Sequence, residues 1–154
     1  MEWTYIITGG FYDFLFSLGT GFDPKGHKAL IAGDGNARLF GADVADIAKY
    51  TVAILLDPET KNKKLFAYTE SFTWNEAVKV FEEVSGKKFE VTYESIEDLH
   101  KVPQNPDADF YTKILAHIKA KLNNGEDFPA SDAHKYKDIK PLSIKEKAKQ
   151  INGQ

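Results

Sequence analysis

Residues 3–13 read WTYIITGGFYD, and no other stretch of the chain carries as much structural information. Its first six residues are all β-branched or aromatic, with large side chains on both alternating faces. Such a strand is typical of a parallel sheet that is covered on both faces. Gly9 and Gly10 then permit a sharp turn. We therefore predict a buried strand over residues 3–8, whose neighbouring strands come from elsewhere in a larger sheet.

An aromatic segment follows the two glycines. Apolar residues recur at helical spacing, which predicts a short helix with a stripe formed by Phe11, Phe14, Leu15 and Leu18. The segment holds more rings than one face of a short helix can bury, namely Phe11, Tyr12, Phe14 and Phe16. Core packing is the first explanation for these rings, and a planar ligand or a partner surface is the alternative.

Strand and helix signals alternate through the rest of the chain. Residues 29–32 are strand-like, residues 33–36 have turn chemistry, and residues 39–40 are expected as the returning strand. Asp43 is expected to begin a helix that ends before Pro58. This order of elements predicts a mixed α/β protein.

Two capping boxes mark further helices. Thr73 and Glu76 begin one that stops at Gly86, and Ser143 and Glu146 begin a last one. Between them, residues 89–94 alternate as a strand with one solvated face, and an apolar stripe predicts a longer helix over residues 110–122.

Composition excludes several classes of function. The chain has 154 residues, with 20 Lys and Arg against 23 Asp and Glu, so there is no basic excess for a nucleic-acid partner. The absence of cysteine excludes disulfides, thiolate metal sites and cysteine nucleophiles. No apolar run approaches the about 20 residues that cross a membrane, and no signal peptide is recognisable. We therefore expect a cytoplasmic protein with neither nucleic acid nor membrane as partner.

Two glycine clusters are interpreted as turns rather than nucleotide sites. A dinucleotide fingerprint needs Gly-x-Gly-x-x-Gly between a strand and a helix. The cluster at residues 19–21 has its third glycine too late, at Gly26, and the cluster at residues 33–35 has Arg38 in that place.

No other pattern marks a catalytic or a metal site. Tyr136 and Lys140 match the Tyr-x-x-x-Lys spacing of some reductases, but they stand in a loop-like stretch before Pro141. The histidines lack a second histidine at helical spacing, which favours surface positions for His27, His100, His117 and His134. No catalytic residue and no metal ligand is therefore predicted.

Several motifs together resemble the NmrA-like and isoflavone-reductase-like proteins, which are atypical short-chain dehydrogenase/reductases. Residues 3–13 resemble the fifth Rossmann strand of that family and the segment after it. Residues 31–36 resemble its glycine-rich turn, residues 43–50 its acidic helix start, and residues 72–76 the segment that opens its next helix. The resemblance covers residues 2–100 well.

The resemblance implies an α/β fold of a particular kind. It implies the carboxyl-terminal part of a Rossmann-like NAD(P)-binding fold with its smaller substrate-binding subdomain, and with the amino-terminal Rossmann strands absent. Residues 1–154 would form a single partial domain, with residual Rossmann strands and helices over residues 1–70 and substrate-side helices and a strand over residues 71–154. The family's Gly-x-x-Gly-x-x-Gly turn and its upstream lysine have no counterpart in this sequence.

The resemblance also implies a ligand site directly after the first strand. Its cofactor-binding residues would be Gly9, Gly10, Phe11 and Tyr12, and its substrate-binding residues Phe14 and Phe16. The implied cofactor is NADPH, with weak binding or none by this chain alone.

Two functions are compatible with this reading. The first is the substrate-binding portion of an NADPH-dependent reductase of small aromatic compounds, inactive alone. The second is a non-catalytic module that senses redox state or pairs with another protein chain along the exposed edge of residues 3–8.

Overall fold

The predicted first strand is present as β1 (Thr4–Ile7) in the computed structural model, which describes residues 1–123 and 128–153. It pairs in parallel with β6 (Lys63–Phe66) and, among the described residues, with no other strand. The prediction of a parallel strand is thereby confirmed. The prediction of burial is wrong for Trp3 and Tyr5, which are 44% and 64% exposed. Their rings lie against each other, with centroids 4.8 Å apart, and neither belongs to a buried cluster of the described residues.

A second sheet is built around β5 and contains three strands. Their order is β2, β5, β7, and their bounds are β2 (Gly10–Phe11), β5 (Arg38–Ala42) and β7 (Glu70–Thr73). β2 lies parallel to β5, whereas β7 is antiparallel to it. The chain thus passes from β1 into a different sheet within three residues, through Gly9.

A third sheet has the order β3, β4, β8, with bounds β3 (Phe22–Asp23), β4 (Lys28–Ala32) and β8 (Glu90–Glu94). The expected hairpin between residues 29–32 and 39–40 is wrong, because β4 and β5 belong to different sheets. The intervening turn instead receives Asn75, whose side-chain amide donates to the carbonyl oxygen of Asp34 at 3.0 Å.

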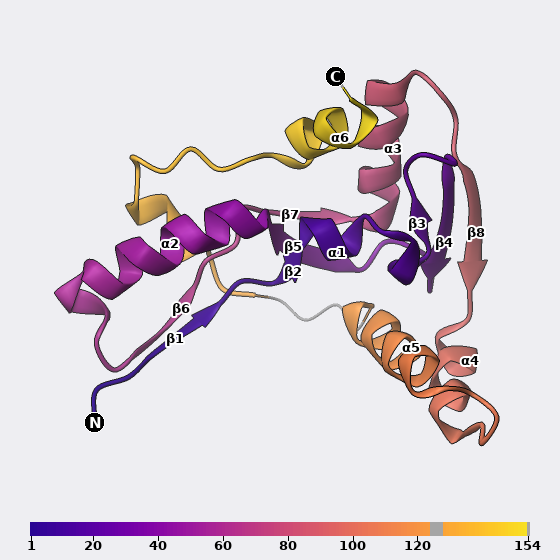
Figure 1. Cartoon of the computed structure of the whole chain (residues 1–154), viewed down its shortest axis with the longest axis horizontal. Coiled ribbons are helices and arrows are strands. Elements are labelled where there is room, and N and C mark those ends of the chain that lie inside the picture. Colours follow the sequence, from indigo (N-terminus) through magenta and orange to yellow (C-terminus); the bar gives the residue numbers. More distant parts are fainter. Residues whose placement is uncertain (124–127, 154) are drawn as a thin grey trace.

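Helices surround these sheets, and their ends follow the capping signals. They are α1 (Tyr12–Leu15), α2 (Val44–Leu56), α3 (Trp74–Ser85), α4 (Ile96–Lys101), α5 (Phe110–Leu122) and α6 (Ile144–Asn152). Both predicted capping boxes are formed, at the starts of α3 and α6. Short 3-10 turns are η1 (Leu18–Thr20), η2 (Pro58–Thr60), η3 (Val102–Gln104) and η4 (Asp132–Lys135). Figure 1 shows α6 beside α3, and α4 and α5 at the opposite end from the first residue.

The largest hydrophobic cluster, here called the aromatic core, joins α1, α3 and the second and third sheets. Its rings are Tyr12, Phe16, Phe22, Phe72, Trp74, Phe81 and Phe89. Within it, Phe16 lies 5.0 Å from Phe81 and 5.4 Å from Phe22 between ring centroids. The predicted stripe of α1 is wrong, because Tyr12, Leu15 and Phe16 are buried while Phe11 and Leu18 are exposed.

A smaller cluster, here called the β1–β6 arm, packs α2 on the pair β1 and β6. Its buried side chains are Tyr50, Ile54, Leu65, Ala67 and Ala133. Figure 1 shows this arm extending away from the aromatic core toward the first residue. The outer side of α2 stays apolar and exposed at Val52, Leu55 and Leu56.

The proposed division at residues 70 and 71 stays a prediction. β7 begins at Glu70 and pairs with β5, so one sheet includes strands from both sides of that boundary. Within the described ranges, no helix combines the length and the apolar character that a membrane span requires.

Candidate functional site

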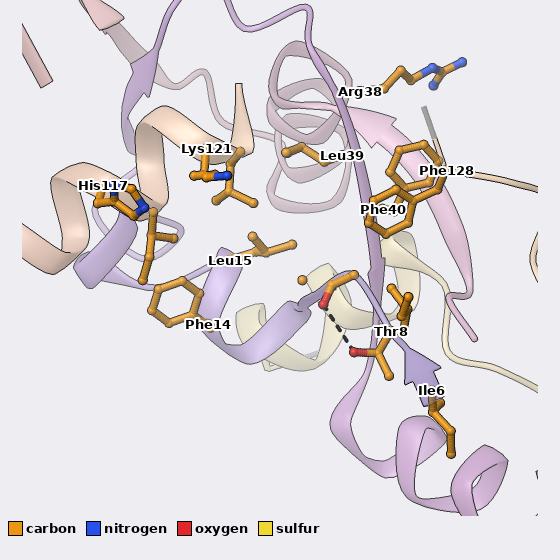
Figure 2. Close-up of a pocket in the computed structure, with 15 residues that line it drawn as sticks. Ile6, Thr8, Phe14, Leu15, Arg38, Leu39, Phe40, His117, Lys121 and Phe128 are labelled. Carbon is orange, nitrogen blue, oxygen red and sulfur yellow. Dashed lines mark hydrogen bonds between the residues drawn. The ribbon is translucent and has the colours of Figure 1, made fainter. Parts of the chain in front are cut away.

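A cavity of about 640 Å³ opens where β1 ends (Figure 2). Its walls come from the end of β1, the Gly9–Gly10 turn, α1, β5, α5 and Phe128. The volume falls within the range of about 300–1,000 Å³ that is usual for small-molecule sites. It also lies at the carboxyl end of a parallel strand, where ligands of open α/β sheets commonly bind.

The Gly9–Gly10 turn requires glycine for a steric reason. Gly9 has a φ of +69°, and a Cβ there would lie 2.3 Å from the carbonyl oxygen of Phe40. A Cβ on Gly10 would lie 2.8 Å from Cδ1 of Leu15. The turn can therefore lie directly against β5 and α1, which brings its bare backbone to the cavity wall.

The one-turn helix α1 separates the predicted site residues. Phe14 lines the cavity together with Gly9 and Gly10. Phe16 lies in the aromatic core instead, and Phe11 is exposed on β2 and does not line the cavity. Successive residues of a helix point about 100° apart, so neighbouring rings cannot share one surface. Contact of Gly9, Gly10 and Phe14 with a ligand stays a prediction.

Tyr12 is also part of the core rather than of the cavity wall. It is fully buried, and its hydroxyl donates to Oε1 of Glu70 at 2.9 Å. Burial, reinforced by the nearby Glu70 carboxylate, raises the pKa of Tyr12 far above its ordinary value. Its phenol therefore stays protonated and holds Glu70, which also accepts from the backbone N–H of Ile144.

Aromatic rings form the opposite wall of the cavity. Phe40 and Phe128 stack with ring centroids 4.6 Å apart and planes only 8° apart. Tyr68 meets Phe40 edge-on at 5.0 Å, and Phe66 meets Phe128 at 5.7 Å. This wall offers a flat apolar surface to a planar ligand.

Three basic or imidazole side chains line the cavity, namely Arg38, His117 and Lys121. Arg38 is paired with Oε2 of Glu76 at 3.4 Å. His117 and Lys121 stand one turn apart on α5, next to the lining residues Ile118 and Leu122. The sequence prediction missed them because each histidine was compared only with other histidines, although the four-residue spacing of His117 and Lys121 was an available signal.

A second hollow, of about 790 Å³, lies between α2 and α6 and is lined by ion-paired side chains. Nζ of Lys147 lies 2.6 Å from Oδ1 of Asp13 and 2.8 Å from Oδ2 of Asp43. Burial opposes ionisation of Asp43, but the hydrogen bonds from Lys147 and from the backbone of Ala45 outweigh it, so the pKa of Asp43 is below its ordinary value. These charges already pair with one another, so we interpret them as structural. The ion pairs of Lys147 with Asp13 and Asp43 are here called the clamp.

Comparison with known proteins gives consistent matches. The profile of the NmrA-like family matches residues 13–148. The isoflavone reductase homolog A622-like of Nicotiana tabacum is 38% identical over 69% of this chain and 36% of its own length. Pinoresinol reductase 2 of Arabidopsis thaliana is 40% identical over 54% of this chain and 27% of its own length. This chain therefore spans well under two thirds of the length of the curated relatives that it matches.

Solved structures match nearly the whole chain. The crystal structure of isoflavone reductase covers 98% of this chain and 53% of its own, with a TM-score of 0.84 and 24% identity. The structure of AtPrR2 with NADP+ and (+)pinoresinol covers 97% of this chain and 51% of its own, with a TM-score of 0.82 and 27% identity. These matches confirm the predicted α/β class and the partial Rossmann-like fold.

Proposed function

This chain belongs to the NmrA-like family, and on that premise we propose that it is the substrate-binding portion of an NADPH-dependent reductase of small aromatic compounds. The observation that carries the proposal is the apolar cavity at the end of β1, with Gly9, Gly10 and Phe14 in its wall. A similar protein, AtPrR2, has been solved with NADP+ and (+)pinoresinol, which supports a ligand pair of this kind.

The cavity suits the nicotinamide end of NADPH better than its phosphates. Pyrophosphate needs free backbone N–H groups in a glycine turn at the start of a helix. The turn at residues 33–36 leads into β5, and a Cβ on Gly35 would lie 2.6 Å from Oδ1 of Asn75, so that turn is already filled. We therefore propose that this chain binds NADPH weakly or not at all by its own residues.

The proposed task of the chain is to hold and orient the substrate. NADPH, when bound, supplies the hydride. The bare backbone of Gly9 and Gly10 permits close approach of a planar group, while Phe14 and the Phe40–Phe128 stack exclude water from it. No described side chain is proposed as the proton donor of the reaction.

A titration of the whole chain tests this proposal. We expect (+)-pinoresinol to shift the amide NMR signals of Gly9 and Gly10, and Phe14→Ala to weaken binding about tenfold through lost ring burial. Leu18→Ala is the matched control, because Leu18 is exposed and does not line the cavity. NMR shifts confined to other residues would refute the location of the site. Micromolar NADPH binding, measured by nicotinamide fluorescence, would refute the proposal that this chain binds NADPH weakly or not at all.

A second candidate function is favoured by the open edge of β1. Within the described chain β1 pairs only with β6, and an exposed strand edge can accept a strand of another protein. The alternative is therefore a non-catalytic redox-sensing or protein-interaction module. Size-exclusion chromatography with light scattering separates the two, since a monomer at all concentrations would count against self-pairing at this edge.

A further inference from the structure

The charges around the cavity are of one sign. Among the side chains that line it, Arg38 and Lys121 are cationic, His117 carries an imidazole, and no described lining residue is a carboxylate. A mostly apolar cavity lined in this way attracts an anionic group and repels a cationic one.

The lining residues differ in whether they are already paired. Arg38 binds Glu76 and the carbonyl oxygen of Ser71, and in Figure 2 its guanidinium points away from the other labelled side chains. Lys121 and His117 have no side-chain hydrogen bond or ion pair with any residue in the described ranges. Lys119, two residues earlier on α5, is by contrast paired with Glu94. The donors left for a ligand are therefore those of Lys121 and His117.

These donors stand beside an aromatic ring that has no ring partner. Figure 2 shows His117, Lys121 and Phe14 on one side of the cavity, with Phe40 and Phe128 on the other. Phe14 makes no ring contact with another aromatic side chain of the described chain, whereas Phe40 and Phe128 are stacked on each other. One side thus combines a partly exposed phenylalanine ring with two nitrogen donors one helical turn apart.

From this juxtaposition we infer that the cavity selects aromatic carboxylates, with the ring against Phe14 and the carboxylate at Lys121 and His117. The inference rests on the proposed function, because it assumes that this cavity is the substrate site. Lys121 and His117 are then specificity-determining residues, because an ammonium and an imidazole N–H can both donate to a carboxylate at the edge of the cavity.

The test compares one acid with its uncharged counterpart on the whole chain. The probes are 4-hydroxycinnamate and its methyl ester, with affinities measured by calorimetry and the site located by amide NMR shifts at Gly9 and Gly10. We expect the acid to bind about tenfold more tightly than the ester, and this preference to weaken as salt is raised.

Variants assign the preference to particular side chains. Lys121→Gln is expected to lower the affinity for the acid much more than the affinity for the ester, which removes most of the preference. His117→Asn is expected to reduce the preference less. Lys113→Gln is the matched control, because Lys113 is on the same helix but does not line the cavity. Circular dichroism checks that each variant is folded.

Each outcome has a defined meaning. A preference lost in Lys121→Gln and kept in Lys113→Gln supports the inference. Equal affinity for acid and ester, or a preference that survives Lys121→Gln, overturns the inference and leaves the proposed function standing. If neither probe binds and (+)-pinoresinol does not bind either, the proposed function is overturned, and the inference with it.

Discussion

The aromatic core and the β1–β6 arm use similar residues and bury them to different degrees. In the aromatic core, sheets and helices enclose rings such as Phe16, Phe22 and Phe81 on every side. In the arm, α2 packs on a two-stranded parallel sheet, and Tyr5 stays largely exposed. Parallel sheets are normally covered on both faces, so the arm has the sequence of an interior strand and the exposure of a surface one.

The clamp formed by Lys147 connects these two parts. Asp13 belongs to α1 next to the aromatic core, whereas Asp43 caps α2 in the arm. Lys147 on α6 binds both carboxylates, so the position of α2 relative to α1 depends on one buried ammonium group. Because α1 also carries Phe14, this clamp indirectly supports the wall of the cavity.

The largest effect is expected in the aromatic core. Phe81→Ala removes a fully buried ring that contacts Phe16, Phe22 and Phe89. We expect the free energy of unfolding to fall by about 3–5 kcal/mol, because a cavity replaces the ring. Phe110→Ala is the control, since Phe110 is 79% exposed. Urea unfolding checks both, and equal effects of the two substitutions would show that the core is not packed as described.

An intermediate effect is expected at the clamp. Lys147→Met leaves Asp43 buried without its partner, which is expected to cost about 2–3 kcal/mol, less than for a fully buried pair because Asp13 is half exposed. Lys149→Met on the solvated side of α6 is the control. The pKa of Asp43 is lowered in the folded chain, so its contribution is present above the ordinary value of 3.8 and is lost as the pH falls through the lowered pKa.

The pH dependence makes this prediction specific. The difference in unfolding free energy between the native chain and Lys147→Met should shrink as the pH is lowered below the ordinary aspartate value of 3.8. A difference that stays constant from neutral to acidic pH would mean that Lys147 contributes packing rather than charge.

The smallest effect on stability is expected at the edge of the arm. Tyr5→Lys places a charge on an exposed strand position and should change the unfolding free energy by no more than about 0.5 kcal/mol. It should, however, abolish any association through β1, because charged side chains block edge pairing. Leu18→Lys outside the arm is the control, and light scattering at rising protein concentration is the measurement. Association that persists in Tyr5→Lys would exclude β1 as the contact.

Local signals in the sequence predicted most of the elements. The helix begun by Asp43 and the two capping boxes are present because each needs only contacts between residues up to three positions apart. The parallel strand at residues 3–8 also follows from side-chain shape. The hairpin expected at residues 29–40 fails because strand pairing joins residues far apart, and β4 pairs with β8 some sixty residues later.

The candidate site was predicted only in part for the same reason. The family resemblance implied Gly9, Gly10 and Phe14, and these three residues line the cavity, although their contact with a ligand stays a prediction. The packing of α1 and α5 decides the rest. It places Phe16 in the core and brings Lys121 and His117 of α5 to the same cavity as Phe14.

The residue types and their spacing thus dictate helix ends, strand character and the glycine turn, because these are decided by backbone sterics and neighbouring hydrogen bonds. Packing assigns everything that requires two distant segments to meet: the sheet partners, the burial of each ring, and the side chains that surround the cavity. Side-chain burial is a property of the whole arrangement, since a ring is shielded only when separate elements close around it.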